Sequence, residues 1–185
     1  MIKKLLSVTL CCTVFYTAKS QITKGNWMLG GNISFASTTY GSQNFSQNTA
    51  YTFQINPNVG YFIGNKFAAG LKTGINLSGY KATGTDIYSK YNNYNVGPFL
   101  RYYFLPTEKM VNILAEGVYQ YGLEGGKNQN TSKNTFTFSA GAVAFLNSSV
   151  GIEFLMSYSS YKFANTSGSN GTIQLGFGLQ VHLIK

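Results

Sequence analysis

The stretch Ile173–Leu183 reads IQLGFGLQVHL and has an apolar residue at every second position. Its odd-numbered residues are Ile, Leu, Phe, Leu, Val and Leu, and its even-numbered residues are Gln, Gly, Gly, Gln and His. Side chains of a β-strand point alternately to the two faces of a sheet. This segment therefore predicts a strand with one wholly apolar face and one face that is polar or bare.

The same alternation returns in seven earlier segments, which predicts eight strands of about a dozen residues each. At about 3.3 Å per residue and a tilt near 40°, a dozen residues span roughly 30 Å, the thickness of a hydrocarbon core. No stretch after Gln21 has the length of a membrane-spanning helix. The seven segments are Trp27–Phe35, Tyr51–Tyr61, Phe67–Leu77, Tyr94–Phe104, Met110–Gly122, Phe136–Ala144 and Ile152–Tyr158.

Acidic residues decide which face of a strand points outward. Hydrophobicity alone leaves the facing of Met110–Gly122 ambiguous, but a charge facing lipid at the midplane costs about 2–4 kcal/mol for Arg or Lys and somewhat less for Glu. Glu116 is therefore expected to face inward, together with Asn112 and Gln120. By the same reasoning Glu153 faces inward on the seventh strand.

Connections between the strands alternate between long and short. Short periplasmic turns and long external loops are typical of transmembrane β-barrels, which must close because an open edge cannot be satisfied in lipid. The sequence thus predicts an all-β fold, an eight-stranded antiparallel up-and-down transmembrane β-barrel. The long connections are 41–49, 81–90, 123–133 and 162–170, and the short ones are 64–66, 105–109 and 147–149.

Composition agrees with a chain that makes little contact with water. Of its 185 residues, 44% are apolar and only 10% are charged, whereas soluble domains carry about 25% charged residues. Aromatic residues near the strand ends are expected to form two girdles at the membrane interfaces. One girdle comprises Trp27, Tyr61, Phe67, Tyr102 and Phe104 near the turns, and the other Tyr40, Tyr51, Tyr80, Tyr94, Tyr121 and Tyr158 near the long loops.

The N-terminus has the pattern of a secretory signal peptide. A basic start, an apolar run over 5–16 and small residues at Ala18 and Ser20 predict cleavage before Gln21. Residues 1–20 are then the signal and residues 21–185 the barrel domain, located in the outer membrane. Cleavage removes Cys11 and Cys12, which leaves the mature chain without cysteine, and lowers the net charge from +9 to +6. The remaining basic residues form no stripe, which argues against nucleic acid.

Four charged residues are predicted to meet inside the barrel: Lys72, Arg101, Glu116 and Glu153. Two cations and two anions sum to zero charge, and the interior of an eight-stranded barrel is just wide enough for side chains to fill it. A salt-bridge cluster would then plug the lumen. The alternative is a gate, whose pairs break and re-form to admit ions or small solutes.

No residues with catalytic, cofactor-binding or metal-ligating spacing stand out, and we expect no enzyme and no cofactor. A hydrolase or acyltransferase would need a nucleophile with a positioned base. The one histidine, His182, lies near the end of the last strand without a nearby Ser, so a structural, hydrogen-bonded role is expected.

Three stretches, 57–66 (PNVGYFIGNK), 97–104 (GPFLRYYF) and 144–153 (AFLNSSVGIE), resemble the small outer-membrane β-barrel family of Gram-negative bacteria, the OmpA/OmpX-like group. The resemblance covers essentially the whole mature chain and implies the porin-like barrel fold and assembly by the barrel-assembly machinery. It implies little about function, because members of one fold do many things. No peptidoglycan-binding domain is expected after the barrel.

Two features depart from this pattern. Pro57 and Pro98 each remove a hydrogen-bond donor from a structure without edges, so bulges are expected there. The chain closes on Ile184 and Lys185, whereas the assembly signal of such barrels commonly ends on an aromatic residue.

The predicted role is structural or interactive, in adhesion or envelope integrity, through the external loops. Expected partners are outer-membrane lipids, an unknown extracellular ligand at the loops, and lipopolysaccharide phosphates near Lys81, Lys90, Lys127, Lys133 and Lys162. Two alternatives stay open: a narrow gated pore, and a soluble secreted lipocalin-like carrier in which the same alternation is turned inside out.

Overall fold

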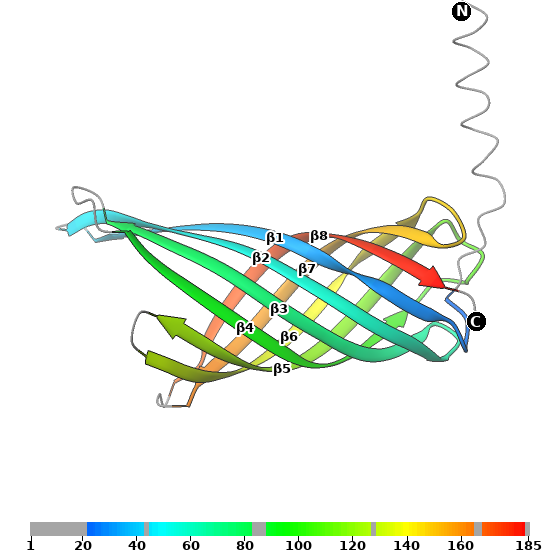
Figure 1. Ribbon diagram of the computed structural model, residues 1–185. Helices are drawn as coiled ribbons and strands as arrows, with labels where there is room; N and C mark the ends of the chain where they lie inside the picture. The colour runs from blue at the N-terminus through cyan, green and yellow to red at the C-terminus, as the bar shows by residue number, and fades with distance from the viewer. Residues whose placement is uncertain (1–21, 43–44, 83–87, 127–128, 165–167, 184–185) are drawn as a thin grey trace, which may run out of the picture.

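The computed structural model describes residues 22–42, 45–82, 88–126, 129–164 and 168–183 (Figure 1). The predicted signal peptide, with Cys11 and Cys12, lies outside these residues. The strands are β1 (Trp27–Ser42), β2 (Phe45–Gly64), β3 (Phe67–Ala82), β4 (Tyr88–Tyr103), β5 (Val111–Gly126), β6 (Gln129–Phe145), β7 (Val150–Phe163) and β8 (Asn170–Leu183).

The strands form one closed barrel in the order β1 to β8. Every neighbouring pair is antiparallel, including β1 with β8. The predicted eight-stranded antiparallel up-and-down barrel is therefore confirmed. The described part of the chain contains no helix long and apolar enough to cross a membrane.

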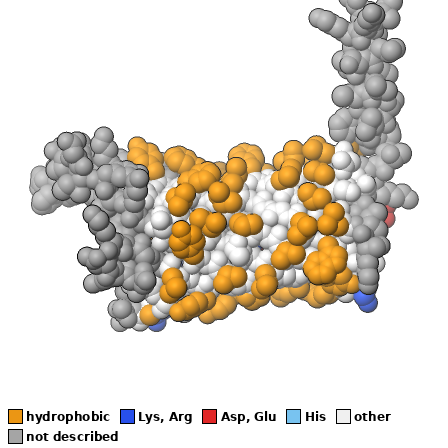
Figure 2. Space-filling model, viewed as in Figure 1, with side chains coloured by type: hydrophobic (Ala, Val, Ile, Leu, Met, Phe, Trp, Pro, Cys, Tyr) orange, Lys and Arg blue, Asp and Glu red, His pale blue; other side chains and the backbone are white. Residues whose placement is uncertain are grey.

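Large apolar side chains face outward along the described strands. Phe35, Leu100 and Phe177 are each exposed over more than half of their surface, whereas Glu116 and Glu153 are buried. Figure 2 shows apolar side chains spread along the visible face of the barrel wall, with charged groups on that face only near its ends. The lipocalin-like carrier is thus wrong, because such a carrier would turn its apolar face inward and its charges outward.

The strands are longer than predicted. They have 14 to 20 residues, because they continue beyond the apolar alternation into the Asn-, Ser- and Thr-rich segments assigned above to long loops. β1 and β2, for example, remain paired as far as Ser42 and Phe45. Backbone pairing does not require apolar side chains, so a pattern based on hydrophobicity detects only the part of a strand that faces lipid.

The bulges expected at the prolines are absent. Pro57 pairs with Gly31 on β1, and Pro98 pairs with Leu71 on β3. On their other sides the β2–β3 and β4–β5 ladders skip two residue pairs and resume in the same register. Each ladder therefore accommodates the missing N–H by leaving pairs open rather than by inserting a residue.

The seam between β1 and β8 is the shortest ladder of the barrel. It contains eight residue pairs, from Trp27↔Leu183 to Ser34↔Gly176. Both strands continue beyond the last pair, β1 to Ser42 and β8 back to Asn170, but they are not paired with each other there. Figure 1 shows the two strands diverging toward the long-loop end.

A short segment before β1 crosses the turn end of the barrel. Ile22 is fully buried, and its carbonyl accepts a hydrogen bond from the backbone N–H of Lys66 at 2.9 Å. Lys66 adopts φ 66° in the tight turn between β2 and β3, close to the predicted position. The backbone N–H of Lys24 donates to Oδ1 of Asn65 in the same turn at 3.0 Å. These contacts hold Ile22 in the lumen.

Aromatic residues lie outward at both ends of the apolar belt. Trp27 packs edge-on against Tyr61 with 5.2 Å between ring centroids, and Tyr102 packs edge-on against Phe104 at 5.1 Å. The exposed tyrosines nearer the long loops are Tyr51, Tyr94, Tyr121 and Tyr158. The side chains of Tyr40 and Tyr80, which were predicted for the same girdle, lie outside the described residues.

Candidate functional site

The four predicted lumen charges lie together in the half of the barrel nearer the short turns. Lys72 projects from β3, Arg101 from β4, Glu116 from β5 and Glu153 from β7, and each is at most 5% exposed. The register places Arg101 directly opposite Glu116. Inward facing follows from strand parity, since a one-residue shift would turn these charges toward lipid.

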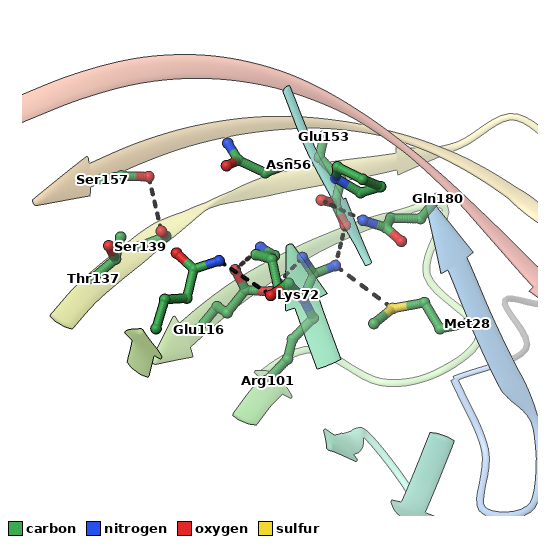
Figure 3. A network of polar contacts seen from close by, with 12 residues as sticks. Met28, Asn56, Lys72, Arg101, Glu116, Thr137, Ser139, Glu153, Ser157 and Gln180 are labelled. Atoms are coloured by element: carbon green, nitrogen blue, oxygen red, sulfur yellow. Dashed lines mark hydrogen bonds and ion pairs between the residues drawn. The ribbon is translucent and has the colours of Figure 1, made fainter. Parts of the chain in front are cut away.

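Ion pairs connect the four side chains into one chain (Figure 3). Lys72 Nζ pairs with Glu116 Oε1. Arg101 donates to Glu116 Oε2 from Nε at 2.9 Å and approaches it with Nη2 at 2.7 Å, while its Nη1 lies 2.5 Å from Glu153 Oε1. Arg101 thus bridges both carboxylates through charge-assisted hydrogen bonds, and the cluster is neutral.

Neutral groups complete the cluster. Arg101 Nη1 also donates to the Tyr103 hydroxyl at 3.2 Å, and Gln180 Nε2 donates to Glu153 Oε2 at 3.4 Å. The ring of Phe99 lies beside both cations, with its centroid 5.7 Å from Lys72 Nζ and 6.0 Å from Arg101 Cζ. Buried charges are stable only when they are paired and hydrogen-bonded, and these contacts supply that condition.

An apolar zone fills the lumen between the cluster and the short turns. Sequence reasoning missed this zone, because it treated the inner face as polar or bare. The signal was present in the inward-facing members of consecutive apolar residues, such as Phe62 beside Tyr61 and Tyr103 beside Tyr102. It belongs to a buried apolar cluster that comprises Ile22, Met28, Phe62, Ala68, Phe99, Tyr103, Leu114, Val118, Val143, Phe145 and Leu155. Of these, Phe99, Val118 and Leu155 lie on the long-loop side of the charged residues of their strands.

On the long-loop side of the cluster, the lumen becomes a polar cup. Its volume is about 30 Å³, and it is lined mainly by hydroxyl and amide side chains. Ser139 and Ser157 share a hydrogen bond of 2.8 Å across β6 and β7, as do Thr137 and Ser159. A cavity of this size has room for one or two water molecules. The floor of the cup is the Lys72–Glu116 pair.

His182 faces inward as predicted but lacks the expected hydrogen bond. Its side chain is fully buried, and neither ring nitrogen has a partner among the described residues. The imidazole instead lies among aromatic rings, with centroid distances of 5.5 Å to Phe62, 5.6 Å to Phe145 and 6.4 Å to Tyr103. The expectation failed because the inner face at this end is largely apolar, so no described side chain hydrogen-bonds the ring.

The described residues bring together no group of three His, Cys, Asp or Glu side chains that could bind a metal ion. The two buried carboxylates are both held by Arg101. The arrangement is a neutral cluster in which each of the four charges has at least one ion-pair partner.

Comparison with known proteins agrees with the fold. A model of the outer membrane protein beta-barrel domain family matches residues 5–180. The crystal structure of Neisserial surface protein A (NspA) superimposes with a TM-score of 0.54 at 14% sequence identity, over 85% of this chain and 97% of the other. Among curated proteins no sequence matches.

Proposed function

The chain belongs to the outer membrane protein β-barrel domain family and lies in the outer membrane, and from this premise we propose that it is a non-catalytic barrel with a sealed lumen. Its role is structural or interactive, in envelope integrity or adhesion, and is exerted at the long-loop end. The barrel-assembly machinery inserts it, and outer-membrane lipids surround its apolar wall.

The observation that carries the sealed lumen is the succession of two barriers along the barrel axis. The ion-paired cluster spans β3, β4, β5 and β7, and the apolar zone with Ile22 fills the lumen toward the turns. An ion passing through would have to separate Arg101 from its carboxylates and then cross a region without polar partners. Leaving one buried charge of such a cluster unpaired costs about 3–5 kcal/mol.

Planar bilayer recording tests the sealed lumen. We expect the purified full chain to be electrically silent, and Glu116→Gln to remain silent because the apolar zone still blocks the path. Steady conductance that changes with Glu116→Gln or Arg101→Gln would overturn the proposal and support the narrow gated pore. Glu108→Gln is the control, because Glu108 is exposed in the turn between β4 and β5 and lies outside the lumen.

Basic residues near the long loops support lipopolysaccharide phosphates as partners. Lys162 is exposed, whereas Lys133 lies over the rings of Tyr161 and Phe163 at 5.0 and 5.7 Å. The side chains of Lys81, Lys90 and Lys127 lie outside the described residues. We expect Lys162→Gln to weaken binding of lipopolysaccharide to the protein in vesicles, and Lys109→Gln at the turn end to leave it unchanged.

The interactive role is tested with the barrel in phosphatidylcholine vesicles against host proteins, polysaccharides and lipopolysaccharide. The structural role is tested separately by deleting the gene and measuring sensitivity of the cells to detergent. Sensitivity that the wild-type chain restores supports envelope integrity. A deletion strain with normal resistance, combined with specific binding in the panel, assigns the protein to the interactive role.

A further inference from the structure

The β1–β8 seam leaves a wedge in the barrel wall. The last pair is Ser34↔Gly176, and the six residues Asn170–Leu175 of β8 have no partner on β1, although β1 continues to Ser42. The edge of β8 that faces β1 therefore lacks backbone hydrogen bonds over these residues. In a closed barrel, the neighbouring strand would normally supply them. In lipid an unpaired strand edge is costly, so such an opening calls for an occupant.

The wedge begins within the apolar belt. Phe35 on β1 and Ile173 and Leu175 on β8 flank it and face outward, with exposed fractions of 63%, 64% and 55%. A molecule entering the wedge from the side therefore comes from the membrane and not from water.

An apolar groove runs along the outer side of the same seam. Its volume is about 430 Å³, and it is lined by Gly31, Ile33, Pro57, Ile152, Phe177 and Leu179 among others. Gly31 forms a low point, because it faces outward between Pro57 and Leu179 without a side chain. The pair Ile33↔Phe177 lies one position from the end of the ladder, so the groove reaches the wedge. The groove is continuous with the lipid-facing surface.

The polar cup reaches the inner side of the wedge. Ser34 and Gly176, the last paired residues, line the cup together with Gln174, which lies on the unpaired edge of β8. Ser34 Oγ donates to Gln54 Oε1 at 3.4 Å. The charged residues lining the cup are Lys72 and Glu116, which pair with each other.

From these three features we propose that the seam is a lateral binding site for an amphipathic membrane lipid. Its hydrocarbon chain lies in the groove beside Gly31, and its head enters the cup through the wedge. The head then lies toward the long loops and the chain toward the bilayer centre, which is the orientation of a lipid in the outer leaflet. This inference goes beyond the sealed barrel and does not depend on it.

The lining of the cup selects the head group. Ser34, Gln54 and Gln174 offer hydroxyl and amide groups, while the charges at the floor are already neutralised. The site thus suits an uncharged head rich in hydroxyl groups, such as that of a glycolipid, better than an anionic phosphate. Because the cup holds only about 30 Å³, one or two hydroxyls enter it and the rest of the head stays in the wedge.

A fluorescence-quenching experiment tests the site. The probe is an alkyl glucoside with a brominated chain, added to phosphatidylcholine vesicles containing the full chain with Trp27→Phe. Phe177→Trp places the reporter in the groove, and Phe138→Trp places it on β6, where the native ring is outward-facing and 51% exposed. We expect quenching at position 177 to saturate at a several-fold lower probe fraction than at position 138. Equal quenching at the two positions would overturn the proposal.

Two further experiments distinguish binding of the lipid head group from binding of the hydrocarbon chain. A probe with the same brominated chain and a phosphocholine head is expected to require several-fold more lipid for the same quenching at position 177. Gln174→Leu should abolish this difference by weakening glucoside binding alone. Identical behaviour of both probes with the native cup would overturn the assignment of the head. Heat-modifiable mobility on gels verifies that each variant is folded.

Hydrogen exchange examines the wedge itself. Without ligand, the amides of β8 that would face β1 between Ile173 and Leu175 are expected to exchange faster than the paired amides of Phe177 to Leu179. Full protection at low protein concentration would show a closed seam and overturn the proposal. Protection that increases with protein concentration would assign the edge to pairing with a second copy, which would overturn it as well.

Discussion

Arg101 is the residue that holds the lumen cluster together, because among the described residues it alone forms ion pairs with both buried carboxylates. Arg101→Met is expected to destabilise the barrel by about 3–5 kcal/mol, since Glu153 loses its cation and Glu116 retains only Lys72. Urea unfolding in vesicles, followed by the heat-modifiable band, measures the loss.

A combined variant provides the control for this prediction. The combined variant removes all four charges together and carries Arg101→Met, Glu116→Gln, Glu153→Gln and Lys72→Met. Replacing a buried ion network by well-packed uncharged residues often changes the stability of a protein little. We expect it to recover most of the stability lost in the single variant. A combined variant as unstable as Arg101→Met would show that packing, and not unpaired charge, causes the loss.

At His182, in contrast to Arg101, a substitution is expected to stabilise the barrel. Burying its two ring nitrogens without hydrogen-bond partners costs free energy. His182→Phe keeps an aromatic ring among Phe62, Tyr103 and Phe145 without buried polar atoms. We expect it to raise the free energy of unfolding by about 1 kcal/mol. His182→Ala should lower it instead by leaving a cavity, and a loss of stability with Phe would mean that the imidazole has a partner in the folded barrel.

These residues also show what sequence reasoning can reach. Glu116 and Glu153 were placed inward from the cost of a charge in lipid, and their pairing with Arg101 followed from depth along the strands. The surroundings of His182 could not be derived in this way. Period-two alternation assigns a face to each residue but does not say which residues of seven other strands meet across the lumen.

Among the elements, β4 shows how closely the strands approach each other. A Cβ added to Gly97 would lie 2.7 Å from Gln120 Cα on β5, whereas one added to Gly117 would meet nothing within 4 Å. Gly97→Ala is therefore expected to lower the free energy of unfolding by about 1–3 kcal/mol, and Gly117→Ala to change it little. Equal urea midpoints for the two variants would contradict the close approach of β5 to Gly97.

Two features of the strands could not be predicted from the sequence: the pairing around the prolines and the positions of the strand ends. The number and order of strands, and the positions of the short turns, follow from alternation and turn residues. Whether Pro57 causes a bulge or an open pair depends on the register on both of its sides, which local sequence does not contain. The extension of β1 and β2 to Ser42 and Phe45 lies in polar sequence, where alternation carries no signal.

For the whole molecule, the apolar belt predicts a dependence on depth. Leu100 and Phe104 both face outward in line with β4, at 54% and 53% exposure, but Leu100 lies deeper in the belt and Phe104 at its turn end. Leu100→Arg is expected to cost about 2–4 kcal/mol and Phe104→Arg about 0–1 kcal/mol. The ratio of folded to unfolded protein in a urea titration measures both, and equal costs would place the membrane elsewhere on the barrel.

The length of the strands also decides what an approaching macromolecule meets. β2 has 20 residues, which at about 3.3 Å each and a tilt near 40° reach about 50 Å, some 20 Å more than the hydrocarbon core. The surplus is a hydrogen-bonded pedestal on the outer side. Binding to a preordered surface avoids much of the entropy lost when flexible segments are ordered. Because this pedestal lies beyond the hydrocarbon core, its side chains need not be apolar, and their chemistry can differ without altering the barrel below.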